Sequence, residues 1–241
     1  MNIKSYIPNT VTSMNLLCGT VGVIVTFSGN LSLAFLLMLA AALFDFCDGL
    51  TARALHAYSD MGKELDSLSD MVSFGVLPAC MLYMTMHICT FSDSVICYVP
   101  VILAVFSGLR LAKFNIDPRQ SESFIGLPTP AAAMICGSLC YYVAHSPDSF
   151  LAVWVSGKLF IPVLSVVLSV LLVCELPMFS MKIKKGAPAG DTIKRLSFLF
   201  NLAVIGAIVA LLHINWSMTV LLGFIVYILM NAAFAIVSPH K

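Results

Sequence analysis

The chain has 241 residues, of which 60% are hydrophobic and only 10% are charged, and its mean hydropathy is +0.98. Soluble domains carry about 25% charged residues, so this composition excludes an ordinary soluble protein and indicates a multi-pass membrane protein. The net charge of +1 says little about partners, and no nucleic acid is expected among them.

Eight apolar stretches are long enough to cross about 30 Å of hydrocarbon as helices. They cover roughly residues 10–28, 32–55, 69–90, 95–115, 127–145, 157–178, 196–213 and 216–236. Polar turns separate them, and no internal repeat or soluble domain is evident. The first ten residues lack the small-residue site of a cleavable signal, so the first stretch is expected to be a retained helix. The sequence therefore predicts an all-α polytopic bundle of about eight helices, with residues 1–241 forming a single integral membrane domain.

The basic residues predict the orientation of this bundle. Every lysine and arginine except Lys158 falls on one side of the predicted membrane. Because positive residues concentrate in cytoplasmic segments, this side and both termini are expected to be cytoplasmic, in the cell membrane. Lys158 is expected to reach the outer interface with its long side chain.

Six of the twelve acidic residues lie between Asp45 and Asp70, where the second predicted span ends and the third begins. On a helix, Asp45 and Asp48 share one face with two small residues, Gly49 and Ala52, and Arg53 lies at its margin. Gly62, Asp66 and Asp70 repeat at intervals of four and share a face of the next helix.

Two helices joined by a short turn would direct four carboxylates toward one point, at the cytoplasmic side. Such carboxylates repel one another unless cations lie among them, and hard divalent ions prefer oxygen ligands. The alternative is structural: Asp45 and Asp48 end a helix, while Asp66 and Asp70 pair with Arg53 or Lys63.

The segment 45–70 reads D-x-x-D-G-x-x-A-R-x8-G-x3-D-x3-D and resembles the signature of the CDP-alcohol phosphotransferase family. Every fixed position of that signature is matched. Three further segments resemble the phosphatidylserine synthase branch of the family: residues 65–79, 109–115 and 124–130.

The resemblance implies metal-dependent transfer of a phosphatidyl group from CDP-diacylglycerol to L-serine, with release of CMP. It implies two Mg²⁺ or Mn²⁺ ions held by four carboxylates, namely Asp45, Asp48, Asp66 and Asp70. Asp70 is the expected general base and Asp66 the alternative. The CDP-linked lipid is expected at Asp48, Gly49, Ala52, Arg53 and Gly62.

The acceptor side is expected on the helix that ends near residue 115, where Arg110, Lys113 and Asn115 would bind the acceptor carboxylate or a lipid phosphate. Anchoring of a helix end by positive residues is the alternative for these three. The resemblance also implies a homodimer.

Two other functions stay open at this stage. The acceptor could be another alcohol, such as glycerol 3-phosphate or inositol phosphate. An ion transporter would also carry acidic residues in the membrane, although usually near the bilayer midplane in broken helices. A prenyltransferase would need a D-D-x-x-D or N-D-x-x-D pattern, which the sequence lacks.

Overall fold

The computed structural model describes residues 3–90, 94–117, 124–179 and 189–237, and these are almost entirely helical. The predicted all-α membrane protein is therefore confirmed. The two short strands, β1 (Phe124–Ile125) and β2 (Pro177–Met178), pair antiparallel with two residues each. The α-helices are α1 (Ile3–Phe27), α2 (Leu31–Leu55), α3 (Asp60–Asp70), α4 (Leu77–Thr90), α5 (Ile102–Ile116), α6 (Thr129–His145), α7 (Phe150–Val155), α8 (Phe160–Val173), α9 (Ala189–Leu211) and α10 (Ser217–Val237).

Six helical segments of the described residues are long and apolar enough to cross a membrane. They coincide with predicted spans one to four, seven and eight, and run over Tyr6–Phe27, Leu31–Leu55, Asp60–Thr90, Val95–Ile116, Thr192–Leu211 and Ser217–Ala235. The other two predicted spans correspond to α6 and α8, which have 17 and 14 residues. At 1.5 Å per residue these helices extend only about 26 Å and 21 Å. The count of eight spans therefore stays a prediction.

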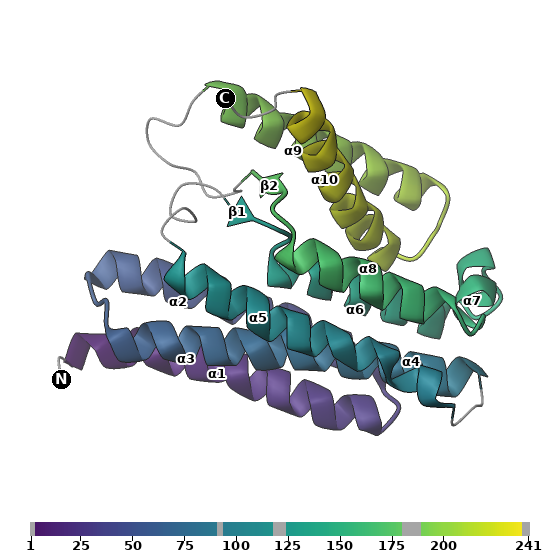
Figure 1. The fold of residues 1–241 in the computed structure, drawn as a ribbon, viewed down its shortest axis with the longest axis horizontal. Helices are drawn as coiled ribbons and strands as arrows, with labels where there is room; N and C mark the ends of the chain where they lie inside the picture. Colours follow the sequence, from purple (N-terminus) through teal and green to yellow (C-terminus); the bar gives the residue numbers. More distant parts are fainter. Residues whose placement is uncertain (1–2, 91–93, 118–123, 180–188, 238–241) are drawn as a thin grey trace.

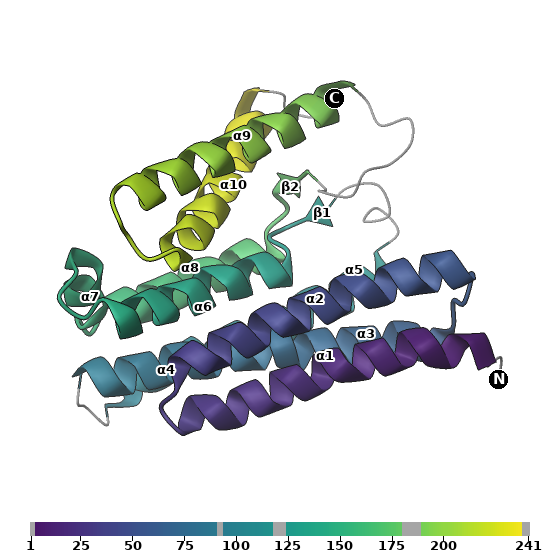
Figure 2. The ribbon, with the colours of Figure 1, turned by 180° about the vertical axis from the view of Figure 1, so that it is seen from behind.

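The helices form a layered bundle (Figures 1 and 2). The hairpin of α1 and α2 packs against the long helical segment that contains α3 and α4, and α6 contacts α2 and α4. The α9–α10 hairpin lies over α6 and α8, with α10 in contact with α6 (Figure 2). This arrangement makes α6 the central helix.

Small side chains allow this central position. Residues 131–140 of α6 are all buried, and the sequence there includes three consecutive alanines from Ala131 to Ala133. At Gly137 a β-carbon would overlap the side chains of Phe35 and Met38 on α2. Because the interior is close-packed, a larger residue at position 137 would force the two helices apart.

The third predicted span starts later than the helix that the structure contains. The sequence predicted a start near residue 69, whereas the helix begins at Asp60. Its N-cap residue, Ser59, accepts a hydrogen bond from Gly62 N at 3.0 Å. Hydropathy misses this first part because α3 is polar along one side. Between α3 and α4, Met71–Val76 forms a π-helical segment (η1), a deviation that is frequent at functional sites.

Polar residues of α3 and η1 form hydrogen bonds with α1. Ser69 donates to the carbonyl of Thr12 at 3.3 Å, and Ser73 donates to the carbonyl of Asn15 at 3.1 Å. A β-carbon at Gly19 would lie 2.9 Å from Ser73 Cα, so this contact requires glycine. The first helix is therefore held against the segment that carries two of the predicted site carboxylates.

Candidate active site

The predicted turn between the two acidic helices is present. The helix α2 ends at Leu55, and its C-cap residue, His56, adopts the left-handed conformation with φ of +47°. The amide of Ala57 then donates back to the carbonyl of Ala52 at 3.0 Å, as at many helix C-termini. Four residues after α2 ends, α3 begins, so the acidic faces of the two helices meet.

Three of the four predicted metal ligands lie together. Carboxylate oxygens of Asp45, Asp48 and Asp66 are all within 4.8 Å of one another. Asp48 is only 6% exposed, and its Oδ2 has no hydrogen-bond partner among the described residues. A buried charged oxygen without a partner is costly unless a cation binds it. The donor set, composed only of oxygen atoms, fits a hard divalent cation.

The fourth predicted ligand, Asp70, lies one turn beyond Asp66 on α3 and interacts electrostatically with all three of the other aspartates. Its Oδ1 accepts a hydrogen bond from Asn15 Nδ2 at 3.3 Å. Asp70 therefore belongs to the acidic group, but the tight set of three described above does not include it.

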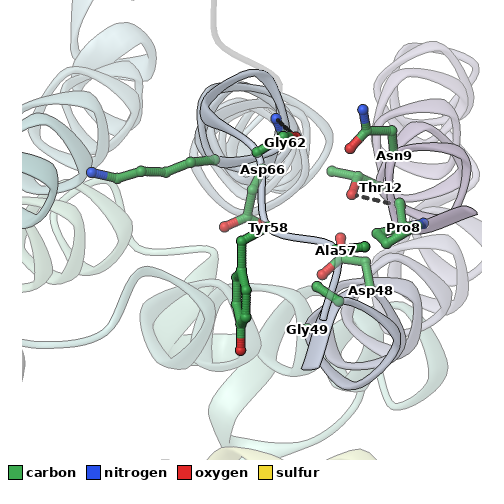
Figure 3. Close-up of a pocket in the computed structure, with 12 residues that line it drawn as sticks. Pro8, Asn9, Thr12, Asp48, Gly49, Ala57, Tyr58, Gly62 and Asp66 are labelled. Carbon is green, nitrogen blue, oxygen red and sulfur yellow. Dashed lines mark hydrogen bonds between the residues drawn. The ribbon is translucent and has the colours of Figure 1, made fainter. Parts of the chain in front are cut away.

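A cavity of about 180 Å³ opens beside these carboxylates. Figure 3 shows Asp48 and Gly49 from α2, Asp66 and Gly62 from α3, and Asn9 and Thr12 from α1 around it. Three small residues predicted to contact the CDP-linked lipid, Gly49, Ala52 and Gly62, all line this cavity.

Gly62 shows why small residues are needed. A β-carbon there would lie 2.9 Å from Asn9 Oδ1 and 3.0 Å from Ser59 Oγ. The fifth predicted lipid contact, Arg53, is exposed, and its guanidinium folds back toward Gly49, with Nη2 at 3.8 Å from the position a β-carbon would take. The arginine therefore lies next to Gly49, although it is not among the residues that line the cavity.

The residues from α1 were missed by the sequence analysis. The polar residues Asn9, Thr12 and Asn15 recur at intervals of three on one face of an apolar span. Polar residues at such spacing in a transmembrane helix often mark a functional face, and this signal could have found them. Asn15 is fully buried, at 0% exposure, which is consistent with a residue held in the interior for its hydrogen bond to Asp70.

The three residues predicted for the acceptor have different surroundings. Arg110 is 6% exposed, interacts electrostatically with Asp70, and has Nη1 at 3.4 Å from Thr129 Oγ1. Lys113 instead lies 3.7 Å from Glu175, after α8. Asn115 donates to Ser67 Oγ at 2.8 Å. Arg110 therefore interacts with one carboxylate of the acidic group, while the other two residues join α5 to neighbouring segments.

Comparison with known proteins identifies the class to which this fold and site belong. Residues 5–173 match the family model of the CDP-alcohol phosphatidyltransferases. The chain belongs to this family, as its acidic signature predicted, and is an enzyme of the phosphatidyltransferase class.

The names of individual relatives specify a reaction more narrowly than the family does. The chain is 37% identical over 130 residues to the CDP-diacylglycerol–serine O-phosphatidyltransferase of Bacillus subtilis, covering 54% of this chain and 72% of the relative. It is 33% identical over 219 residues to the protein of the same name from Mycobacterium leprae, covering 85% and 67%. It is also 34% identical over 143 residues to the archaetidylserine synthase of Methanothermobacter thermautotrophicus, covering 56% and 59%.

Proposed function

We propose that this enzyme transfers the phosphatidyl group of CDP-diacylglycerol to L-serine and forms phosphatidylserine and CMP. The observation that carries the proposal is the group of three carboxylates, Asp45, Asp48 and Asp66, beside a cavity lined by small residues. The names of the Bacillus and Mycobacterium relatives support serine as the acceptor.

Four aspartates, Asp45, Asp48, Asp66 and Asp70, would hold two Mg²⁺ or Mn²⁺ ions. When bound, divalent ions would neutralise the diphosphate and stabilise the charge on the departing CMP. The carboxylates alone would repel the diphosphate, so the donor is expected to bind only when the ions are present.

The donor would occupy the cavity. Gly49, Ala52 and Gly62 leave room for the nucleotide against α2 and α3, and Asp48 lines the same wall. Arg53, whose guanidinium lies near Gly49, would bind a phosphate oxygen, because a guanidinium is suited to two parallel hydrogen bonds.

Asp70 is the proposed general base. Asp66 belongs to the tight group of three carboxylates, whereas Asp70 lies one turn further and is oriented by Asn15. Asp70 would accept the proton of the serine hydroxyl while that oxygen bonds to the β-phosphorus and the bond from phosphorus to CMP breaks. Asp66 remains the alternative base.

Arg110 would bind the carboxylate of serine, because it is a buried guanidinium on α5 that interacts electrostatically with Asp70. Lys113 and Asn115 would also bind the acceptor or a phosphate at the end of α5, and their contacts with Glu175 and Ser67 would hold that end of the helix in place. We further propose that residues 1–241 form one catalytic membrane domain, that its site faces the cytoplasm in the cell membrane, and that the protein is a homodimer.

The test is an assay of the purified protein with CDP-diacylglycerol, Mn²⁺ or Mg²⁺, and a panel of alcohols. We expect CMP release to depend on L-serine. Release with glycerol 3-phosphate or inositol phosphate instead would replace the acceptor and keep the reaction class. No release of CMP with any alcohol would contradict the proposed transfer. In that case the alternative function, an ion transporter, would need testing.

A further inference from the structure

One aromatic residue lies among the small and acidic residues of the cavity. Of the twelve described residues that line it, Tyr58 alone has an aromatic side chain. Figure 3 shows this side chain extending from the turn between α2 and α3, away from the α1 residues Asn9 and Thr12. Its position falls among the eight unspecified residues between Arg53 and Gly62, so the acidic signature of the family assigns it no role.

The backbone on both sides of Tyr58 is fixed by helix caps. Before it, His56 adopts the left-handed conformation, and the amide of Ala57 donates to the carbonyl of Ala52 at 3.0 Å. After it, Ser59 is the N-cap of α3, and its side chain accepts a hydrogen bond from the first turn of that helix at 3.0 Å. The turn therefore presents Tyr58 at a defined place, while the residue is 73% exposed and has room for a partner on its ring.

The other lining residues divide the cavity by chemistry. Asp48 and Asp66 belong to the group of three carboxylates, where divalent ions would hold the diphosphate of the donor. Lys63, the basic residue of the lining, directs its ammonium to the carbonyl of Asn115 on α5 at 3.3 Å. A nucleobase has a flat face on either side, and an aromatic ring is a surface on which any base can stack. Among the lining residues, Tyr58 offers such a surface.

We propose that Tyr58 binds the cytosine base of the donor, which stacks on the face of the tyrosine ring. This inference rests on the proposed function, because it takes a CDP-linked lipid as the donor. Anchoring at the membrane surface, where tyrosines are enriched, is the alternative role. The two roles differ in what they require, since stacking needs the ring and the base but neither the hydroxyl group nor the lipid chains.

The test compares side chains with and without a ring at position 58. Calorimetry measures the binding of CMP, and of ribose 5-phosphate, which lacks the base, to the purified protein in the presence of Mn²⁺. Tyr58→Leu should weaken CMP binding by about fivefold to hundredfold, the usual scale for loss of one contact between a base and an aromatic ring. Tyr58→Phe keeps the ring and should bind CMP within about twofold of the wild type. Ribose 5-phosphate should bind all three proteins equally.

A second exposed tyrosine provides the matched control. Tyr98 is 59% exposed, lies in the 3₁₀-helical segment η2 (Val95–Val101) and does not line the cavity. Tyr98→Leu should therefore leave CMP binding unchanged. The Mn²⁺ affinity of Tyr58→Leu should equal that of the wild type, because the substitution leaves the carboxylates in place.

Four results would overturn the inference. The first is unchanged CMP binding in Tyr58→Leu, which would return Tyr58 to the membrane surface. The second is an equal loss of affinity for ribose 5-phosphate, and the third is a parallel fall in Mn²⁺ affinity, since neither depends on the base. The fourth is a loss in Tyr58→Phe as large as that in Tyr58→Leu, because the ring is then not what binds CMP.

Release of CMP in the acceptor panel keeps this outcome distinct from that of the proposed function. If the wild-type protein binds CMP but releases none with serine, serine is refuted, and the binding of CMP to the variants still decides the role of Tyr58. If release depends on serine and Tyr58→Leu binds CMP as the wild type does, the proposed function stands and the inference is refuted.

Discussion

Asn15 on α1 donates a hydrogen bond from Nδ2 to Asp70 Oδ1 over 3.3 Å and thereby connects the first helix to the carboxylate proposed as general base. The two residues are 55 positions apart in the chain. Asn15 is fully buried, and its backbone carbonyl also accepts from Ser73. This contact gives the first helix a part in the site, on the face where Asn9, Thr12 and Asn15 interrupt its apolar sequence.

The first prediction concerns this hydrogen bond. Asn15→Ala should lower kcat roughly tenfold, because Asp70 loses the donor that orients its carboxylate. Asn15→Asp should lower it further, since another carboxylate would be placed next to four. The rate of CMP release measures both effects. Asn201→Ala on α9 is the control, because that amide bonds only to its own helix, at the Ser197 carbonyl, among the contacts of the described residues. Wild-type rates in Asn15→Ala would remove Asn15 from the site.

The second prediction concerns the metals. Replacing Asp45, Asp48 or Asp66 with Asn should abolish CMP release and weaken Mn²⁺ binding, since each change removes an anionic ligand. Binding is measured directly by titration of Mn²⁺ with an electron paramagnetic resonance readout, independently of activity. Asp60→Asn is the matched control, because Asp60 is an exposed carboxylate in the first turn of α3. Full activity in EDTA would contradict the metal-dependent site.

The third prediction concerns the space beside α3. Gly62→Ala would place a β-carbon 2.9 Å from Asn9 Oδ1 and narrow the cavity. The KM for CDP-diacylglycerol should rise, while the KM for serine should change little. Gly206→Ala on α9 meets only an ordinary contact at 3.6 Å and provides the control in a helix. A larger effect on serine than on the lipid would place the donor elsewhere.

The local parts of the site could be predicted from the sequence. Asp45, Asp48, Gly49 and Ala52 follow helical spacing within one helix, and the next helix starts after a short turn. Spacing and turn length together are enough to bring Asp48 and Asp66 within 4.8 Å. Local periodicity determines such contacts, and a single sequence contains it.

The long-range parts could not be predicted. The contact of Asn15 with Asp70 depends on how distant helices pack, and no local spacing encodes that. Lys113 illustrates the same limit: its side chain lies 3.7 Å from Glu175, a contact that local spacing does not encode. The number of membrane spans could not be predicted securely for the same reason. Hydropathy does not distinguish α6, which is buried within the protein, from a helix that faces lipid.

The fourth prediction concerns topology. A reporter fused after Lys241 or within residues 183–193 should be cytoplasmic, and one placed near Asp93 or Ser146 should be external. Accessibility to a membrane-impermeant reagent, measured in intact and in opened cells, distinguishes the two sides. An external location for residues 183–193 would contradict both the predicted orientation and the cytoplasmic site.

The last prediction separates the two candidate bases. Asp70→Asn preserves the size of the side chain and leaves the group of Asp45, Asp48 and Asp66 intact, but an amide cannot accept the proton of the acceptor hydroxyl. Because its amide oxygen can still coordinate a cation, the variant should retain part of the Mn²⁺ affinity and should bind CDP-diacylglycerol, while transfer to serine falls by at least ~10², the usual scale for loss of a general base. Asp66→Asn should instead lose metal binding together with activity. Comparing Mn²⁺ affinity with turnover in the two variants therefore assigns the roles. Near-normal turnover by Asp70→Asn would transfer the role of base to Asp66, because that carboxylate is the nearest alternative on the same face of α3.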